Sequence, residues 1–274
     1  SRESIALAQY EKRKKAVSTL KEIDTRPDNY IIVHYTCDNF KVSQIISSIA
    51  VRQLADGQTE SFSLYKAAQE MNIENDAIPN NQEKIEKKML TDYYKFVNKN
   101  LEKKWIHWGM NSDNYGFKAI EHRYRVLGSR PKYIADDKKI NLASLFIDAY
   151  GKGYAKHPRM ESLITKNKIS SPNDFLPGYN NNPDTLDEVK ALHQRQYKLI
   201  QMSCLRKVDI FENFINLAIN KQLKTYTPWI KIYGLSIKGI LASLNEQWWF
   251  KALTYIVVAV AGYFFNNYMD SIFK

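Results

Sequence analysis

The chain has 274 residues, of which 44% are hydrophobic and 25% charged, a balance that argues against a disordered chain and indicates a folded domain. Its formal net charge of +11 favours anionic partners such as nucleic acid, nucleotides or acidic lipid. The only two cysteines, Cys37 and Cys204, lie far apart, which excludes a disulfide-rich scaffold and indicates a reducing compartment. The charged start of the chain does not resemble a signal peptide, so we expect the main domain to face the cytoplasm.

The first half of the chain predicts one helix followed by three strands. Residues 2–23 have the pattern of a basic amphipathic helix, which defines an N-terminal segment over 1–25. Apolar and alternating runs then predict an antiparallel meander of three strands, at 30–35, 45–52 and 59–64.

The second half is mostly helical. We predict helices at 82–99, 114–127, 141–150 and 159–167, a short strand at 105–108, and one long helix over about 184–223. The stretch 171–186, rich in Pro, Asn and Gly, is expected to be an insertion. These elements predict a single soluble domain over 26–224, followed by an amphipathic segment over 225–246.

The longest apolar run lies near the end of the chain. It covers 18 residues from Trp248 to Phe265 and is interrupted only by Lys251, which is near the lower limit for crossing a bilayer. We therefore predict a transmembrane or membrane-inserting helix over 247–270, in the inner (cytoplasmic) membrane; a helix buried in a core or against a partner subunit is the alternative. Interface-anchoring chemistry is expected from Trp248, Trp249, Phe250, Lys251, Tyr263 and Phe264.

The order of the elements over about 28–223 resembles that of the DEDD (DnaQ-like) 3′–5′ exonucleases. The resemblance implies an α/β fold, an RNase H-like mixed sheet flanked by helices, to which the C-terminal transmembrane helix would be added. In that family the first strand carries two carboxylates that bind Mg²⁺ ions. The corresponding positions here are His34 and Thr36, and Asp38 lies just beyond them.

Two further aspartates match the pattern of that family. Asp113 follows the strand at 105–108, and Asp209 lies on the last helix, where the general-base histidine of the family would fall on Cys204. The resemblance therefore leaves at most Asp38, Asp113 and Asp209 as catalytic carboxylates, which indicates a degenerate site. Mg²⁺ or Mn²⁺ would be needed only if activity remains, with no cofactor otherwise. The alternatives are that Asp113 caps a helix and that Asp209 is an ordinary exposed residue.

The segment 105–125 combines aromatic rings with guanidinium groups, which suits stacking on nucleic-acid bases or binding of a partner. The alternative is that alternate residues are core and the arginines are solvated. The candidates for binding are Trp105, His107, Trp108, Asn111, Asn114, Tyr115, Arg123 and Arg125.

Together these features predict a membrane-anchored, catalytically degenerate nuclease-like protein that acts with a protein partner as an effector at the membrane. By analogy with sensor–effector pairs, such an architecture suits prokaryotic antiviral defence, and an effector with one weak helix would need to form a homo-oligomer. One alternative is a metal-dependent 3′–5′ exonuclease tethered to the membrane. Another is a soluble subunit of a nucleic-acid-binding complex.

Overall fold

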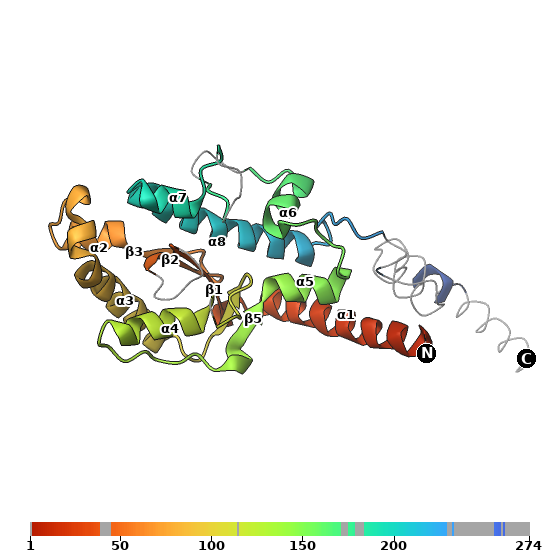
Figure 1. Ribbon diagram of the computed structural model, residues 1–274. Coiled ribbons are helices and arrows are strands. Elements are labelled where there is room, and N and C mark those ends of the chain that lie inside the picture. Colours follow the sequence, from red (N-terminus) through yellow and green to blue (C-terminus); the bar gives the residue numbers. More distant parts are fainter. Residues whose placement is uncertain are drawn as a thin grey trace, which may run out of the picture.

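The computed structural model describes residues 2–38, 45–113, 115–170, 175–178, 184–228, 232, 255–258 and 260, with the backbone alone for 2–7. Over these residues the protein is an α/β structure in which one five-stranded mixed sheet carries helices on both faces (Figure 1). The strands are β1 (Tyr30–Cys37), β2 (Ile46–Gln53), β3 (Thr59–Ser63), β4 (Lys104–His107) and β5 (Lys139–Asn141).

The strand directions place three strand ends together. The order across the sheet is β3-β2-β1-β4-β5. Strand β1 pairs antiparallel with β2, and β2 with β3, whereas β1, β4 and β5 run parallel to one another. The carboxyl ends of β1, β4 and β5 therefore lie at one edge of the sheet, the usual place for ligands in open α/β sheets.

Strand β1 is central, and all eight of its residues are buried. Its side chains alternate between the faces, as the geometry of a strand requires. Val33 and Tyr35 join the core formed with α2 (Leu64–Glu70), α3 (Gln82–Lys99) and α4 (Phe117–Val126). Ile32 joins the second core, formed with the helices that cover the other face of the sheet. A strand covered on both faces explains why the sequence 30–35 is almost entirely apolar.

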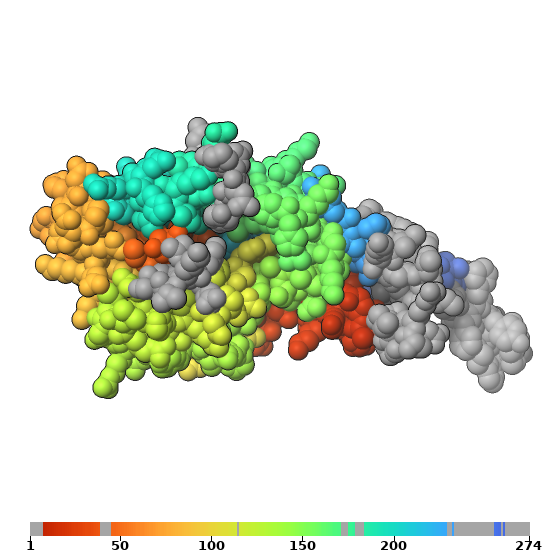
Figure 2. Space-filling model, in the orientation of Figure 1, coloured from red at the N-terminus to blue at the C-terminus, as the bar shows by residue number. Residues whose placement is uncertain are grey.

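The helices of the second face are α1 (Arg2–Thr25), α5 (Leu142–Tyr150), α6 (Arg159–Asn167) and α8 (Tyr197–Ile219). The short helix α7 (Glu188–His193) precedes α8, and single 3₁₀ turns lie at Pro27–Asn29, Asn75–Ala77, Pro79–Asn81 and Asp136–Lys138. Helices α1 and α5 lie side by side (Figures 1 and 2). Leu20 and Ile23 of α1 are buried in the second core, so the end of this basic helix is packed on the domain.

The predicted elements differ from the structure at three places. Strand β5 and helix α2 were not predicted. The long helix expected over 184–223 is divided into α7 and α8, with Arg195 between them at a φ of +59°. A positive φ cannot continue a right-handed helix, so the chain changes direction there.

The transmembrane helix that we expected over 247–270 is a wrong prediction. Within the described part of the chain, no helix combines the length and apolar character needed to cross a bilayer. Of that segment, only 255–258 and 260 are described, as helical residues with exposed side chains. Lys251 and Gly262, together with the β-branched residues, weaken the run as a helix of the required length. The predicted anchors Trp248, Trp249, Phe250, Lys251, Tyr263 and Phe264 lie outside the described residues.

Candidate functional site at the carboxyl ends of the parallel strands

A cavity of about 550 Å³ lies where β1, β4 and β5 end. We call it the strand-end cavity. Its walls come from the ends of these strands and from the beginnings of α5, α6 and α7. The residues that matter for its chemistry are His34, Thr36, Trp108, Arg159, Glu188 and Lys207. Its volume is within the range of pockets that bind small ligands or a single nucleotide.

A buried ion pair forms part of the cavity wall. The Lys207 ammonium on α8 lies 2.6 Å from Oε1 of Glu188 at the start of α7, and the two side chains are 2% and 9% exposed. The Thr36 hydroxyl of β1 donates to the same carboxylate oxygen over 3.0 Å. The Glu188 carboxylate is paired with Lys207 and already accepts a hydrogen bond from Thr36, so it is poorly suited to bind a divalent cation.

His34 is the second unusual group of the cavity. It is only 4% exposed, and neither of its ring nitrogens has a hydrogen-bond partner among the described residues. Its ring packs edge-on against Phe211, with 5.6 Å between the centroids. Burial, and then the charge of Lys207, hold the pKa of His34 well below its usual range. The imidazole is therefore neutral at physiological pH.

The three aspartates that we expected to form a catalytic site each have a separate local partner. Oδ1 of Asp38 accepts from the Ile45 backbone N–H over 3.1 Å, which closes the β1–β2 connection. Asp113 forms an exposed ion pair with Lys118 at 2.8 Å. The N-cap of α4 is Gly116, so Asp113 does not cap that helix either.

Asp209 pairs at 3.0 Å with Arg52, which is in the last part of β2, at the end of the strand opposite the strand-end cavity. None of Asp38, Asp113 and Asp209 lines this cavity. Nor do the described residues contain any group of three or more His, Cys, Asp and Glu side chains arranged to hold a metal ion.

The predicted binding patch at 105–125 is split by the fold. Trp108, Asn111 and Tyr115 line the strand-end cavity, and Tyr115 also donates its hydroxyl to the Tyr35 carbonyl over 3.1 Å. Trp105 and Arg123 are buried away from the cavity, Trp105 against Phe96 and Arg123 in an ion pair with Glu86. Arg125 is exposed on α4, and Asn114 lies outside the described residues.

Trp108 gives the cavity an aromatic wall. Its ring stacks on Phe211, with centroids 5.5 Å apart and an angle of 12° between the planes. In the loop after Trp108, the backbone at Gly116 closely approaches the backbone at Met110. A Cβ atom added at Gly116 would lie 2.3 Å from the Met110 carbonyl oxygen. The φ of Gly116 is +154°, so glycine is required there on both counts. This loop positions Asn111 in the wall of the cavity.

His107, another predicted binding residue, is a core histidine. It is 2% exposed, and its Nδ1 accepts from the Met110 backbone N–H over 3.0 Å. Burial, assisted by the charge of Lys139, lowers the pKa of His107 from 6.5 to about 4.

This pKa predicts a loss of stability in mild acid. As the pH falls below 6.5, His107 takes up a proton in the unfolded chain but not in the folded one, so the free energy of unfolding decreases until the pH reaches about 4. The decrease assigned to His107 is at most about 3 kcal/mol. We expect urea unfolding at a series of pH values to show a shallower decline for His107→Gln than for the natural protein. The exposed His122, changed to Gln, is the control and should leave the decline unaltered; equal slopes for all three proteins would contradict this account.

The two cysteine thiols are poor nucleophiles. Cys37 lines the strand-end cavity, and Cys204 is buried on α8, with its thiol 3.5 Å from the His34 carbonyl oxygen. Burial raises the pKa of each thiol to about 12. Both thiols are therefore protonated at neutral pH, which does not favour covalent catalysis through a thiolate.

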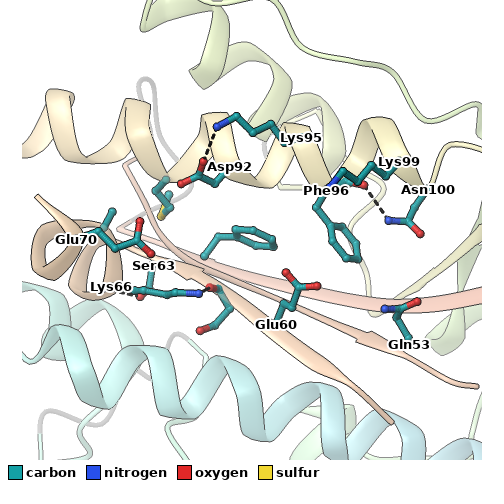
Figure 3. Close-up of a pocket in the computed structure, with 14 residues that line it drawn as sticks. Gln53, Glu60, Ser63, Lys66, Glu70, Asp92, Lys95, Phe96, Lys99 and Asn100 are labelled. Carbon is teal, nitrogen blue, oxygen red and sulfur yellow. Dashed lines mark hydrogen bonds and ion pairs between the residues drawn. The ribbon is translucent and has the colours of Figure 1, made fainter. Parts of the chain in front are cut away.

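A second hollow, the β3 groove, lies on the other face of the sheet between β3, α2 and α3 and has a volume of about 500 Å³. Its floor contains Phe62 and Phe96, and its rim carries both acids and lysines (Figure 3): Glu60, Glu70, Asp92, Lys66, Lys95 and Lys99. Lys95 pairs with Asp92 at 3.0 Å. The rim of the β3 groove therefore carries equal numbers of acidic and basic side chains, and it has no excess of positive charge to favour an anion.

The key residues that the sequence reasoning missed are Lys207, Glu188 and Arg159. A helical signal for Lys207 exists in the sequence. Ser203, Lys207 and Phe211 are spaced four residues apart and share one face of α8, and all three are buried. A lysine on an otherwise apolar helical face marks a buried charge that needs a partner.

Searches against protein-family models, curated proteins and solved structures returned no match to this chain.

Proposed function

We propose that this protein is a nucleic-acid-binding domain that holds the end of a single strand in the strand-end cavity without hydrolysing it. We also propose that its fold is a degenerate relative of the DEDD exonucleases. The strand order and the mixed strand directions support that relationship. The net charge of +11 and the aromatic wall at Trp108 support nucleic acid as the partner.

One observation carries the proposal. The positions at which the resemblance requires metal-binding carboxylates are occupied by the neutral His34 and by Thr36, and a buried Lys207–Glu188 pair adjoins them. Carboxylates clustered around two metal ions are what the hydrolytic mechanism of that family uses. A cavity with His34, Thr36 and the Lys207–Glu188 pair at these positions is suited to binding a strand and not to hydrolysing it. Binding of the strand therefore needs neither Mg²⁺ nor Mn²⁺.

The proposal is tested with the full chain and a short fluorescent single-stranded oligonucleotide, as DNA and as RNA. We expect fluorescence anisotropy to show binding in EDTA that Mg²⁺ or Mn²⁺ does not strengthen, and we expect gels of the same samples to show oligonucleotide of unchanged length. Arg159→Gln, in the cavity wall, should weaken binding by about tenfold through loss of a charge-assisted hydrogen bond.

The matched control is Lys99→Gln, because Lys99 is exposed on the rim of the β3 groove. It should leave the affinity within a factor of about two, since a single exposed charge contributes little. Shortening of the oligonucleotide that requires Mg²⁺ or Mn²⁺ would support the exonuclease alternative. Absence of binding to either nucleic acid would contradict the proposal.

One observation also supports a role as a subunit with a protein partner. Tyr255, Ile256, Val257 and Val258 are each more than half exposed, which is unusual for consecutive large apolar residues.

A further inference from the structure

We propose that a strand bound in the strand-end cavity continues across a basic cluster around Tyr226, whose lysines contact its internal phosphodiesters. This inference rests on the proposed function and adds the surface that holds the rest of the strand. The basic cluster consists of five exposed side chains: Lys152, Lys156, Lys166, Lys168 and Lys224.

Three segments of the chain form the basic cluster: the loop before α6, α6 with the residue that ends it, and the stretch after α8. The Tyr226 backbone N–H donates to the Tyr154 carbonyl over 2.9 Å, which joins the stretch after α8 to the loop. The Asn167 side chain joins the same stretch to α6, because it accepts from the Lys224 N–H over 2.8 Å and donates to the Lys224 carbonyl over 3.0 Å. These hydrogen bonds gather lysines that are distant in sequence on one part of the surface.

Two of the lysines share one aromatic ring. The ammonium groups of Lys156 and Lys166 lie 5.1 and 4.7 Å from the centroid of the Tyr226 ring. The two charges are therefore within about 10 Å of each other, which is the Debye length at 0.1 M salt, so salt does not fully screen their repulsion. The ring attracts both cations and offsets part of this repulsion. A pair of cations held in this way favours the closely spaced charges of a polyanion.

The basic cluster has little opposing charge. Its five lysines form no ion pair with any residue that the structure describes. The sequence ranges 151–168 and 220–228, from which the cluster comes, contain one acid, Glu161. An excess of positive charge on exposed lysines is what binding to the phosphate backbone of a nucleic acid requires.

The basic cluster begins where the wall of the strand-end cavity ends. Residues His157–Glu161 line the cavity, and Lys156 directly precedes them. Lys166 lies five positions after Glu161 on the same helix, about 8 Å further along its axis. A cavity of about 550 Å³ has room for little more than the end of a strand. The next nucleotides of a bound strand therefore lie within reach of Lys156 and Lys166.

The test measures binding of the full chain, in EDTA, to single-stranded oligonucleotides of about three and about 12 nucleotides by fluorescence anisotropy. For the double variant Lys156→Gln/Lys166→Gln, we expect the affinity for the longer oligonucleotide at 0.1 M salt to fall about tenfold, because two phosphate contacts are lost. The slope of log affinity against log salt should become shallower by about 1.4. The affinity for the shorter oligonucleotide should change by no more than about twofold, since it does not extend beyond the cavity.

Two control variants separate the basic cluster from a general loss of charge. Lys156→Arg/Lys166→Arg keeps both charges and should bind the longer oligonucleotide as the natural protein does. Lys87→Gln/Lys99→Gln removes the same charge from exposed positions on α3, which covers the opposite face of the sheet from α6. It should leave both affinities within a factor of about two. All three variants should unfold at the same urea concentration as the natural protein, because the replaced side chains are exposed.

Unchanged affinity and salt slope for the longer oligonucleotide in Lys156→Gln/Lys166→Gln would overturn the inference and leave the proposed function standing. An equal loss of affinity for the two lengths, or an equal loss in the α3 control, would show that the cluster is not the path of the strand. If the cluster variant binds the strand normally but loses binding of the natural protein to vesicles containing phosphatidylglycerol, the cluster serves an acidic membrane and the inference is wrong. Failure of both oligonucleotides to bind the natural protein would overturn the proposed function together with the inference.

Discussion

Replacement of Lys207 by methionine is expected to lower the free energy of unfolding by about 3–5 kcal/mol. The reason is that the Glu188 side chain, which is 9% exposed, would lose the ammonium group 2.6 Å away. The Thr36 and Ser203 hydroxyls, at 3.0 and 3.4 Å from the same oxygen, would still donate to it but do not neutralise it. Urea unfolding of the single variant at neutral pH measures the loss.

The double variant Lys207→Met/Glu188→Met is the control for this prediction. Removing both members of a buried pair leaves no uncompensated charge, so we expect it to unfold within about 1 kcal/mol of the natural protein. If the single and double variants are equally destabilised, the effect comes from packing and not from the ion pair. If Lys207→Met alone is as stable as the natural protein, then Lys207 and Glu188 are not paired in the buried arrangement described.

Replacement of Arg123 by methionine is expected to have an effect of similar size, about 3–5 kcal/mol. Arg123 makes two hydrogen bonds to the Glu86 carboxylate, of 2.9 and 2.6 Å, and the side chains are 7% and 0% exposed. Glu86 also accepts from the Ile46 backbone N–H over 2.8 Å, so the pair joins α4, α3 and the start of β2. Burial already raises the pKa of Glu86, and loss of the guanidinium leaves this buried carboxyl group without its counter-ion at the junction.

Arg125 provides a matched control two residues away on the same helix. Because it is exposed, Arg125→Met should change the free energy of unfolding by no more than about 0.5 kcal/mol. Both arginines were predicted from the sequence to contact a nucleic acid, but neither lines the strand-end cavity. At a temperature where Arg123→Met is still folded, we therefore expect both variants to bind the oligonucleotide as the natural protein does. Weakened binding by folded Arg123→Met would contradict its assignment to the core.

The strands and most helices were predictable because their signal is local. The predicted strands at 30–35, 45–52 and 59–64 lie close to the observed β1, β2 and β3, and helix 82–99 has the observed bounds of α3. Strand β5 was not predictable, because three residues carry no alternation and its pairing with β4 is set by tertiary structure. The membrane helix was predicted wrongly from the apolar composition of the C-terminal run and the Trp and Lys residues at its start.

The candidate site was less predictable than the fold because it depends on which face of a helix each residue occupies. Asp209 was chosen from a motif, but it lies two positions after Lys207, and a step of two positions turns a helical side chain to nearly the opposite side. Lys207 therefore lies at the cavity and Asp209 pairs with Arg52. In the segment 105–125, strand and helix alternation decided that Trp108 lines the cavity while Trp105 is in the core. Periodicity in the sequence can indicate which residues face the core. It cannot identify the partner of a buried charge, because that partner comes from a distant part of the chain.

Photocrosslinking tests the central claim, that a strand end lies in the strand-end cavity, most directly. The full chain is mixed in EDTA with oligonucleotides that carry one photoreactive nucleotide, either at an end or in the middle, and crosslinked peptides are identified by mass spectrometry. The account predicts that the terminal probe crosslinks mainly to Trp108, Asn111, Tyr115 and residues His157–Glu161, which line the cavity. The internal probe should crosslink to these residues much less. Crosslinks of the terminal probe concentrated in α2 and α3 around the β3 groove, or spread evenly for both probes, would contradict it.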